Sequence, residues 1–297
     1  MIVLLYRKFI PYRIREKVYR LFLKQILNKY RYFCAWAVSK FVYHFSFLFP
    51  NNEYYNAYRF LGKHGITPYP FEASLKYREM PVEVFHDTAT NMHYVVHHGK
   101  RLYYPRHVKE KNVRLSYRAL STEQDPESAH CYVLSYDELK GKILLDVGAA
   151  EGIFALDVIE YVEKAYLFEC KDIWIEPLMA TFAPWKEKVE IVKKYVDDHD
   201  DEKSITLDTF MEEKEHEHIH LKMDIEGAEQ SALKGAKRLF TNGQSMFFSI
   251  CTYHKKEDAK AIRSFFVSLG YSCKFTQGYF MALPHLRKAV CRGQKEV

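Results

Sequence analysis

Glycine and proline are scarce in this chain, at 12 and 10 of 297 residues. Collagen-like and low-complexity proteins need far more of both, so these classes are excluded. The six cysteines form no C-x-x-C pair and no Cys/His cluster with zinc spacing, and the sequence leads us to assign no metal site. A secreted disulfide scaffold is therefore not expected. The first apolar run, residues 2–5, is too short for a signal peptide and precedes the positive charges, so we expect a cytoplasmic protein.

Acidic residues are nearly absent from residues 1–64, which hold two acids against twelve Lys and Arg. The overall charge of +6 therefore comes from this segment, and a nucleic-acid surface spread over the rest of the chain is not expected. Pro11 and the apolar stripe Ile14, Val18, Phe22 and Ile26 predict a helix.

A second apolar stretch in this segment, residues 33–49, is interrupted by polar residues and is slightly short for a bilayer span. Two interpretations of residues 1–64 stay open. The helices pack on the main domain or on a partner subunit in a homo-oligomer, or they lie peripherally at the inner face of the membrane.

Apolar residues make up 48% of the chain and charged residues 28%, as in a folded globular protein. Alternating patterns over residues 80–105 predict a small antiparallel β element, whereas residues 106–138 show no legible period. We therefore expect three regions: a basic, aromatic-rich helical segment (1–64), a small β-containing region (65–138) and a main domain (139–297).

Short apolar runs alternate with helical stretches from Gly141 onward. Runs of this kind are typical of buried parallel strands. Their alternation with helices predicts an α/β fold with a doubly wound, mostly parallel sheet. The expected strands cover residues 143–145, 165–168, 189–192, 219–223 and 246–250, followed by a helix at 259–269 and a last hairpin at 271–283.

The loops after these strands carry the candidate ligand-binding residues. In doubly wound sheets, ligands bind beyond the carboxyl ends of the strands. The first strand runs into Asp146-Val147-Gly148-Ala149-Ala150-Glu151-Gly152, and the second ends at Glu169. Glycines allow close approach of a ligand, and a carboxylate one strand later can bind ribose hydroxyls. The spacing is not G-x-G-x-x-G, so a nicotinamide-dependent oxidoreductase is not expected.

At these positions the chain resembles the FkbM-type family of S-adenosylmethionine-dependent methyltransferases. The loop at 146–152 is similar to the family's D-V-G-A-x-x-G motif, and Phe168-Glu169 to its F-E. Residues 221–229, Leu-Lys-Met-Asp-Ile-Glu-Gly-Ala-Glu, are similar to its L-K-x-D-x-E-G-A-E signature, and residues 123–130 to a segment that precedes the motifs in part of the family. The chain differs at Cys170 and Ala129, where the family usually has proline.

The resemblance implies a class I methyltransferase (Rossmann-like) fold that uses S-adenosylmethionine. It also implies which residues bind this cofactor. Glu169 would hold the ribose hydroxyls, and Asp197 would meet the adenine amine. The residues of the glycine loop would border the methionine and ribose part of the cofactor; they are Asp146, Gly148, Ala149 and Gly152.

Asp224 and His254 follow the fourth and fifth expected strands, so both should lie at the edge that carries the glycine loop. Methyl transfer to a hydroxyl needs a base within hydrogen-bond reach, and either residue can serve. Asp224 can instead cap the next helix, and His254 can be a polar loop residue. We expect an O-methyltransferase acting on a sugar or glycan, free or lipid-linked. The glycan acceptor follows from the resemblance alone. The alternative is a non-catalytic scaffold that keeps the cofactor fold and acts through its N-terminal helices.

Overall fold

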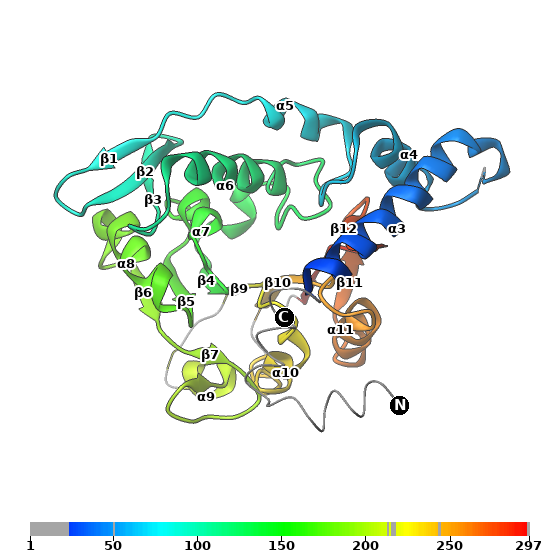
Figure 1. Cartoon of the computed structure of the whole chain (residues 1–297). Helices are drawn as coiled ribbons and strands as arrows, with labels where there is room; N and C mark the ends of the chain where they lie inside the picture. The colour runs from blue at the N-terminus through cyan, green and yellow to red at the C-terminus, as the bar shows by residue number, and fades with distance from the viewer. Residues whose placement is uncertain (1–23, 50, 213, 215–217, 243–244, 296–297) are drawn as a thin grey trace, which may run out of the picture. The chain divides into compact units, whose positions relative to one another are not determined.

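The protein is described here from a computed structural model that covers residues 24–49, 51–212, 214, 218–242 and 245–295 (Figure 1). The chain forms two compact units. The first comprises residues 1–70 with 281–286, and the second residues 71–280 with 287–297. Regions 65–138 and 139–297, expected as separate domains, thus fall largely within the second unit, and that division stays a prediction.

The first unit is built on two packed helices, α3 (Lys24–His44) and α4 (Tyr55–His64), with the 3₁₀ helix η2 (Ser46–Leu48) between them. A Cβ at Gly62 of α4 would lie 2.5 Å from the carbonyl oxygen of Ser39, so only glycine allows this close approach of the helices. One side of α3 is buried at Ala35, Ser39 and Val42.

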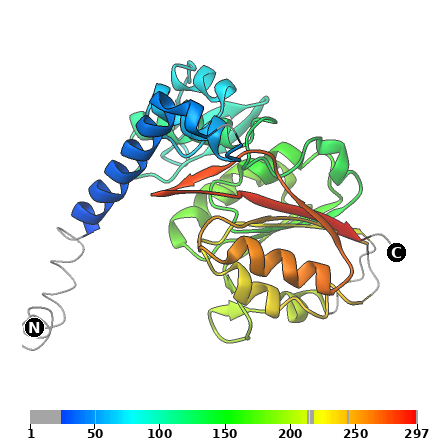
Figure 2. The ribbon, with the colours of Figure 1, turned by 90° about the vertical axis from the view of Figure 1, so that its right-hand side faces the viewer.

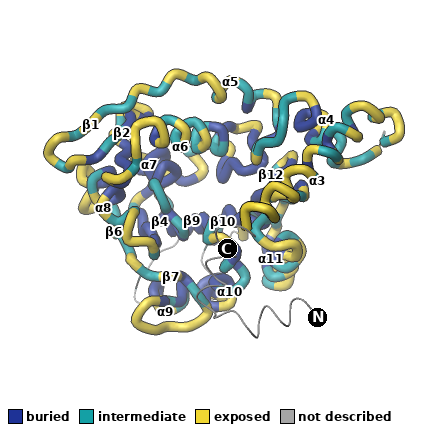
Figure 3. The backbone as a smooth tube through the Cα atoms, in the orientation of Figure 1, coloured by how far each residue is buried: buried dark blue, intermediate teal, exposed yellow. Residues whose placement is uncertain are grey.

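The other side of α3 carries large apolar side chains that remain exposed. The exposed residues of this helix are the yellow stretches of the tube in Figure 3. They include Ile26, Tyr30, Phe33, Trp36 and Phe41. The second apolar stretch predicted from the sequence is therefore largely helical. Most of the first stripe, Ile14, Val18 and Phe22, lies outside the described residues. Within the described part of the chain, no helix combines the length and hydropathy needed to cross a membrane.

The second unit contains a seven-stranded sheet in the order β11-β14-β10-β9-β4-β5-β6. The five consecutive strands β10, β9, β4, β5 and β6 are parallel, and β14 is antiparallel to both of its neighbours, β10 and β11. The strands are β4 (Ile143–Val147), β5 (Lys164–Phe168), β6 (Val189–Val192), β9 (His218–Met223), β10 (Ser245–Cys251), β11 (Ser272–Phe275) and β14 (Val290–Lys295). This confirms the predicted α/β fold and all five predicted parallel strands.

Helices cover both faces of this sheet, and two apolar clusters separate along β4. Leu144 packs into one cluster with side chains of α7 and α8, whereas Ile143, Leu145 and Val147 pack into the other with side chains of α9, α10 and α11. Figure 2 shows α10 and α11, in yellow and orange, side by side below the sheet. The helices are α7 (Ile153–Val158), α8 (Asp172–Thr181), α9 (Leu207–Met211), α10 (Glu229–Lys234) and α11 (Asp258–Ser268), with the 3₁₀ helix η5 (Ala183–Trp185).

The strand order reverses at β4. From β4 the chain continues outward through β5 to β6, and it then returns to place β9 on the opposite side of β4. The crevice at such a switch point is where ligands bind in open α/β sheets. The ends of β4 and β9, paired at Val147 and Met223, therefore mark the candidate site.

The remainder of the second unit is a small antiparallel sheet with helices. The sheet comprises β1 (Phe85–Asp87), β2 (Met92–His97) and β3 (Lys100–Tyr103), as predicted for residues 80–105. Residues 106–138, which show no legible period in the sequence, contain helix α6. This helix was not predicted, because most of its residues are polar or charged. The remaining elements are α6 (Glu110–Glu123), η3 (Glu72–Ser74), α5 (Leu75–Arg78), η4 (Tyr136–Leu139), β7 (Tyr195–Val196) and β8 (Ser204–Ile205).

The predicted hairpin at residues 271–283 is wrong. Its first strand, β11, joins the main sheet beside β14, and the second, β12 (Phe280–Ala282), pairs with β13 (His285–Arg287). The two runs are close in sequence, but β11 finds a longer partner in the six-residue strand β14 than in the three-residue strand β12.

Candidate active site

The glycine loop after β4 has a left-handed backbone at three positions. The φ angles are 84° at Gly148, 47° at Ala150 and 79° at Gly152. A Cβ on Gly148 would lie 2.0 Å from the carbonyl oxygen of Asp224, so the loop touches the end of β9 directly. The amide groups of Gly148 and Ala149 donate to the carbonyl of Phe168 at the end of β5. The loop is thus held at the switch point by both neighbouring strands.

Glu169, at the end of β5, is buried and faces this loop. Its carboxylate accepts hydrogen bonds from the amides of Ala150 (3.0 Å) and Lys171 (2.7 Å). A carboxylate has about four acceptor positions, so two remain for hydroxyl donors. Glu169 therefore lies beside the glycine loop with free acceptor positions, and ribose binding by it stays a prediction.

Asp146 lies one residue before the end of β4 and is fully buried. Its Oδ1 is 2.8 Å from the Nζ of Lys222 on β9, and Lys222 also donates to the carbonyl of Gly148 (2.7 Å). Burial opposes the charge on Lys222, but Asp146 and Asp224 outweigh it and raise its pKa. The pair therefore ties the glycine loop to β9. A contact between Asp146 and the cofactor stays a prediction.

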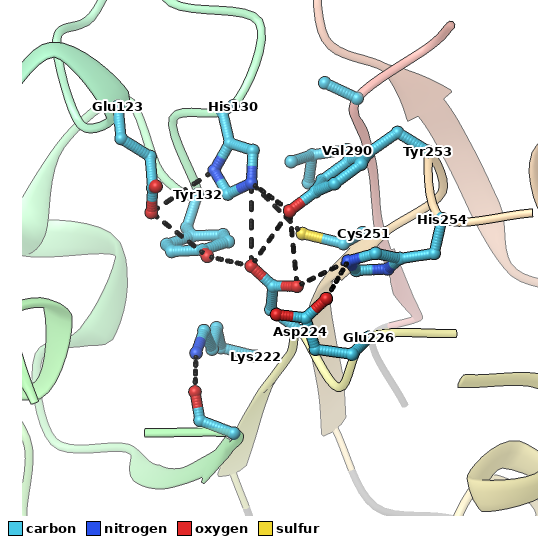
Figure 4. A network of polar contacts seen from close by, with 12 residues as sticks. Glu123, His130, Tyr132, Lys222, Asp224, Glu226, Cys251, Tyr253, His254 and Val290 are labelled. Atoms are coloured by element: carbon cyan, nitrogen blue, oxygen red, sulfur yellow. Dashed lines mark hydrogen bonds and ion pairs between the residues drawn. The ribbon is translucent and has the colours of Figure 1, made fainter. Parts of the chain in front are cut away.

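Asp224 forms the centre of a polar network at the end of β9 (Figure 4). Tyr132 donates to its Oδ2 (3.1 Å), and Tyr253 donates to both of its oxygens (3.4 Å each). Burial opposes ionisation, but the positive charges around it, from His130, Lys222 and His254, leave the pKa of Asp224 below its usual value. Asp224 is therefore a carboxylate at neutral pH, and 19% of its side chain stays exposed.

His254, after β10, points its ring at Asp224, and a catalytic role for either residue stays a prediction. Its Nε2 lies 3.4 Å from Oδ1 of Asp224, and its Nδ1 lies 2.9 Å from Oε1 of Glu229, which is fully buried. Burial alone would lower the pKa of His254, but Glu229 and the charges of Asp224 and Glu226 raise it. The imidazole is thus held by a carboxylate on one nitrogen, while the other faces Asp224 and Glu226.

Four further residues join this network and were not predicted as site residues. His130 lies with Nε2 3.0 Å from the hydroxyl of Tyr253 and 3.5 Å from Oδ2 of Asp224, and with Nδ1 3.4 Å from Glu123. Glu123 and His130 delimit the segment that resembles the family's pre-motif, so a signal was present in the sequence. Tyr132 and Tyr253 carried none, since single tyrosines have no characteristic spacing.

Asp197 follows β7 in an acidic turn. Its carboxylate accepts a hydrogen bond from the amide of Asp198 (2.8 Å), and His199 pairs with Asp198 at 3.2 Å. The turn is thus closed by its own contacts, and an adenine contact from Asp197 remains a prediction.

The network also contains groups that can ligate a metal. Asp224, Glu229 and His254 each offer a ligand atom within 4.8 Å of the others, and His130, Asp224 and Cys251 form a second such group. Carboxylate and imidazole ligands suit zinc and other divalent cations. Burial strongly raises the pKa of the Cys251 thiol, however, which makes it a poor ligand.

Comparison with known proteins gives one family match. Residues 186–273 match the model described as the methyltransferase FkbM domain, which includes β9, Asp224 and His254. No curated protein matches the chain significantly.

Several of the solved structures with a similar arrangement are methyltransferases. They include the FkbM methyltransferase from Methylobacillus flagellatus KT, with 19% identity and a TM-score of 0.42 over 63% of this chain and 56% of that one. The match thus spans about half of that protein's length. Two others are a precorrin-6y methyltransferase from Geobacter metallireducens (8% identity, TM-score 0.38, covering 56% and 88% of the two chains) and an rRNA methylase from Streptococcus thermophilus (11%, 0.37, 54% and 90%).

The sheet order and the switch-point loop agree with the class I methyltransferase fold that the motifs implied. The family predicted from the motifs is the one whose domain model matches residues 186–273.

Proposed function

We propose that the protein is an S-adenosylmethionine-dependent O-methyltransferase whose acceptor is a hydroxyl of a sugar or glycan. The observation that carries the proposal is the juxtaposition of the left-handed glycine loop with the Asp224–His254 pair at one switch point. The sugar as acceptor follows from the family resemblance, and the hydroxyl from the presence of a base.

The residues at the loop fit the proposed cofactor. Glycine at 148 and 152 allows the positive φ angles that shape the loop, and Glu169 keeps acceptor positions for ribose hydroxyls. When bound, S-adenosylmethionine supplies an activated methyl group.

The chain's own residues supply positioning and proton removal. His254 accepts the proton of the acceptor hydroxyl, and Glu229 orients its ring. Asp224 stays ionised and stabilises the imidazolium that forms, while Tyr132 and Tyr253 hold its carboxylate in place. Positioning contributes most of the rate in such an in-line transfer.

The catalytic role is tested with labelled methyl donor and cell-envelope glycans or lipid-linked sugars, followed by product mass. We expect Asp224→Asn and His254→Ala each to lower turnover about 10²- to 10⁴-fold with cofactor affinity almost unchanged. Glu187→Gln, whose side chain is 91% exposed, is the matched control. Equal turnover in all four proteins would show that neither residue acts in proton transfer.

Cofactor binding is tested separately by titration calorimetry. Glu169→Ala should weaken binding about ten- to a hundredfold, since a charge-assisted hydrogen bond is worth about 1.5–3 kcal/mol. Unchanged affinity would remove Glu169 from the site. Tight cofactor binding without methyl transfer to any glycan would instead support the non-catalytic scaffold.

We also propose that residues 1–64 bring the protein to the inner face of the membrane. Their twelve basic residues and the exposed apolar side of α3 favour contact with an anionic surface. This location would place the enzyme beside lipid-linked glycans.

A further inference from the structure

A second cluster of ligating side chains lies away from the glycine loop, around Asp157. This residue sits in α7, a helix whose six residues are all buried. Its side chain is 2% exposed, and a buried carboxylate is costly unless it is paired. Both partners of its Oδ1 are histidines from one hairpin. His97 Nε2 lies at 2.7 Å and His98 Nδ1 at 3.1 Å.

The spacing of these atoms is close to that of a zinc site. Zinc bonds to nitrogen and oxygen of about 2.0–2.1 Å place tetrahedral ligands about 3.3 Å apart. The three ligand atoms lie within 4.8 Å of one another, so small side-chain movements suffice.

The outer contacts also suit a metal site. The Nδ1 of His97 lies 2.9 Å from the hydroxyl of Tyr117, which can fix the ring with Nε2 free to ligate.

His98 occupies a position where the turn itself favours another residue. It follows β2 and forms with Gly99 the two-residue link to β3, with φ angles of 48° and 80°. Two positive φ values are typical of the type I′ hairpin turn, where Asn-Gly is preferred. Histidine is also accepted at positive φ, so this turn can present an imidazole to Asp157.

The cluster is open to ligands. A cavity of about 530 Å³ is lined by His97, His98 and Asp157 together with Tyr117 and Tyr136. Three protein ligands leave one position of a tetrahedral ion for water or for an oxygen of a bound molecule.

We propose that His97, His98 and Asp157 bind a divalent zinc ion with one coordination position facing this cavity. The site is independent of the proposed methyl transfer, since none of its ligands belongs to the Asp224 network.

The test uses the full-length protein, freed of metal with a chelator, and titration with Zn²⁺ against a competing chromophoric chelator. We expect one high-affinity ion per chain. His98→Asn keeps the preferred turn residue but removes the ring. His98→Asn should weaken zinc binding more than roughly 10- to 100-fold, which is the loss expected when only a hydrogen-bond partner of a metal ligand is removed. Asp157→Asn should have a similar effect.

Two variants serve as controls. His107→Ala removes an exposed histidine outside the cluster, and His199→Ala disrupts the exposed Asp197–Asp198–His199 group. Both should bind zinc as the wild type does. Co²⁺ should give visible bands of a tetrahedral nitrogen–oxygen site without thiolate charge transfer.

Three results would overturn the proposal: no zinc retained by the wild type, equal affinity in His98→Asn and the wild type, or a thiolate band with Co²⁺. A loss of affinity in His199→Ala instead of His98→Asn would assign the ion to the acidic turn.

Discussion

At the level of single residues, the protonation of His254 depends on its acidic neighbours. Asp224, Glu226 and Glu229 all lie within 4 Å of its ring nitrogens, and together they raise its pKa above the ordinary value despite burial. A base with a raised pKa is neutral only at higher pH. Activity that depends on His254 should therefore rise with pH through a midpoint above that of free histidine.

Glu229→Gln tests this dependence. The change removes a negative charge but keeps a hydrogen-bond acceptor of the same shape, so the pKa of His254 should fall. We expect the acidic limb of the pH–rate profile to move to lower pH, measured as kcat/KM across pH 5 to 9. Asp208→Asn removes an acid outside the network and should leave the profile in place. An unmoved limb in Glu229→Gln would contradict His254 as the base.

The buried pair of Lys222 and Asp146 makes a prediction about stability. Lys222→Met would leave a buried carboxylate without its cation, which typically costs about 3–5 kcal/mol. Urea denaturation should show this loss, whereas Lys186→Met, at a side chain 79% exposed, should change stability by less than about 0.5 kcal/mol. Similar stabilities of both variants would mean that the pair does not hold the loop.

At the level of elements, the approach of the glycine loop to β9 decides where the candidate base lies. The amide of Asp224 donates to the carbonyl of Val147, and Gly148 lies directly against the carbonyl of Asp224. The loop and the strand end are therefore one unit, and a change in one displaces the other.

Gly148→Ala tests this coupling against a matched glycine. Gly141 also has a positive φ, 69°, but a Cβ there meets nothing within 4 Å. Gly141→Ala should show only the cost of a left-handed alanine, about 1–2 kcal/mol. Gly148→Ala adds a clash with Asp224, so we expect a larger fall in the unfolding free energy and a loss of turnover. Equal effects of the two changes would show that the loop can move away freely.

At the level of the whole molecule, the N-terminal unit differs from the sheet-containing unit in charge and in exposed surface. Its α3 leaves aromatic side chains such as Phe33 (60% exposed) and Trp36 (41%) uncovered. Each basic side chain near an anionic leaflet contributes about 1 kcal/mol, which salt screens, and apolar burial adds a part that salt does not remove.

Vesicle flotation tests membrane contact. The full-length protein should bind anionic vesicles, less so in high salt, and deletion of residues 1–64 should abolish binding. The Phe33→Ser/Trp36→Ser variant should weaken it, whereas Val267→Ser, an equally exposed apolar residue of α11, should not. A stable oligomer that ignores anionic vesicles and dissociates on the same deletion would support subunit packing instead.

The sequence by itself determined the parallel strands and the loops that follow them. Short apolar runs such as residues 143–145 indicate buried strands in this alternating pattern, and the chemistry of Asp146–Gly152, Glu169 and Asp224 is local to their ends. The carboxyl ends of parallel strands lie at one edge of a sheet, so the shared edge of Asp224 and His254 was predictable as well.

Only the tertiary structure decided which distant side chains meet there. His130, itself in contact with Glu123, reaches Asp224 from about 100 residues earlier. Lys222 closes on Asp146, and Asp157 meets His97 across 60 residues. The pairing of β11 with β14 has the same origin. Such contacts leave no periodic pattern in the chain, because each depends on the packing of whole elements and not on the spacing of neighbours.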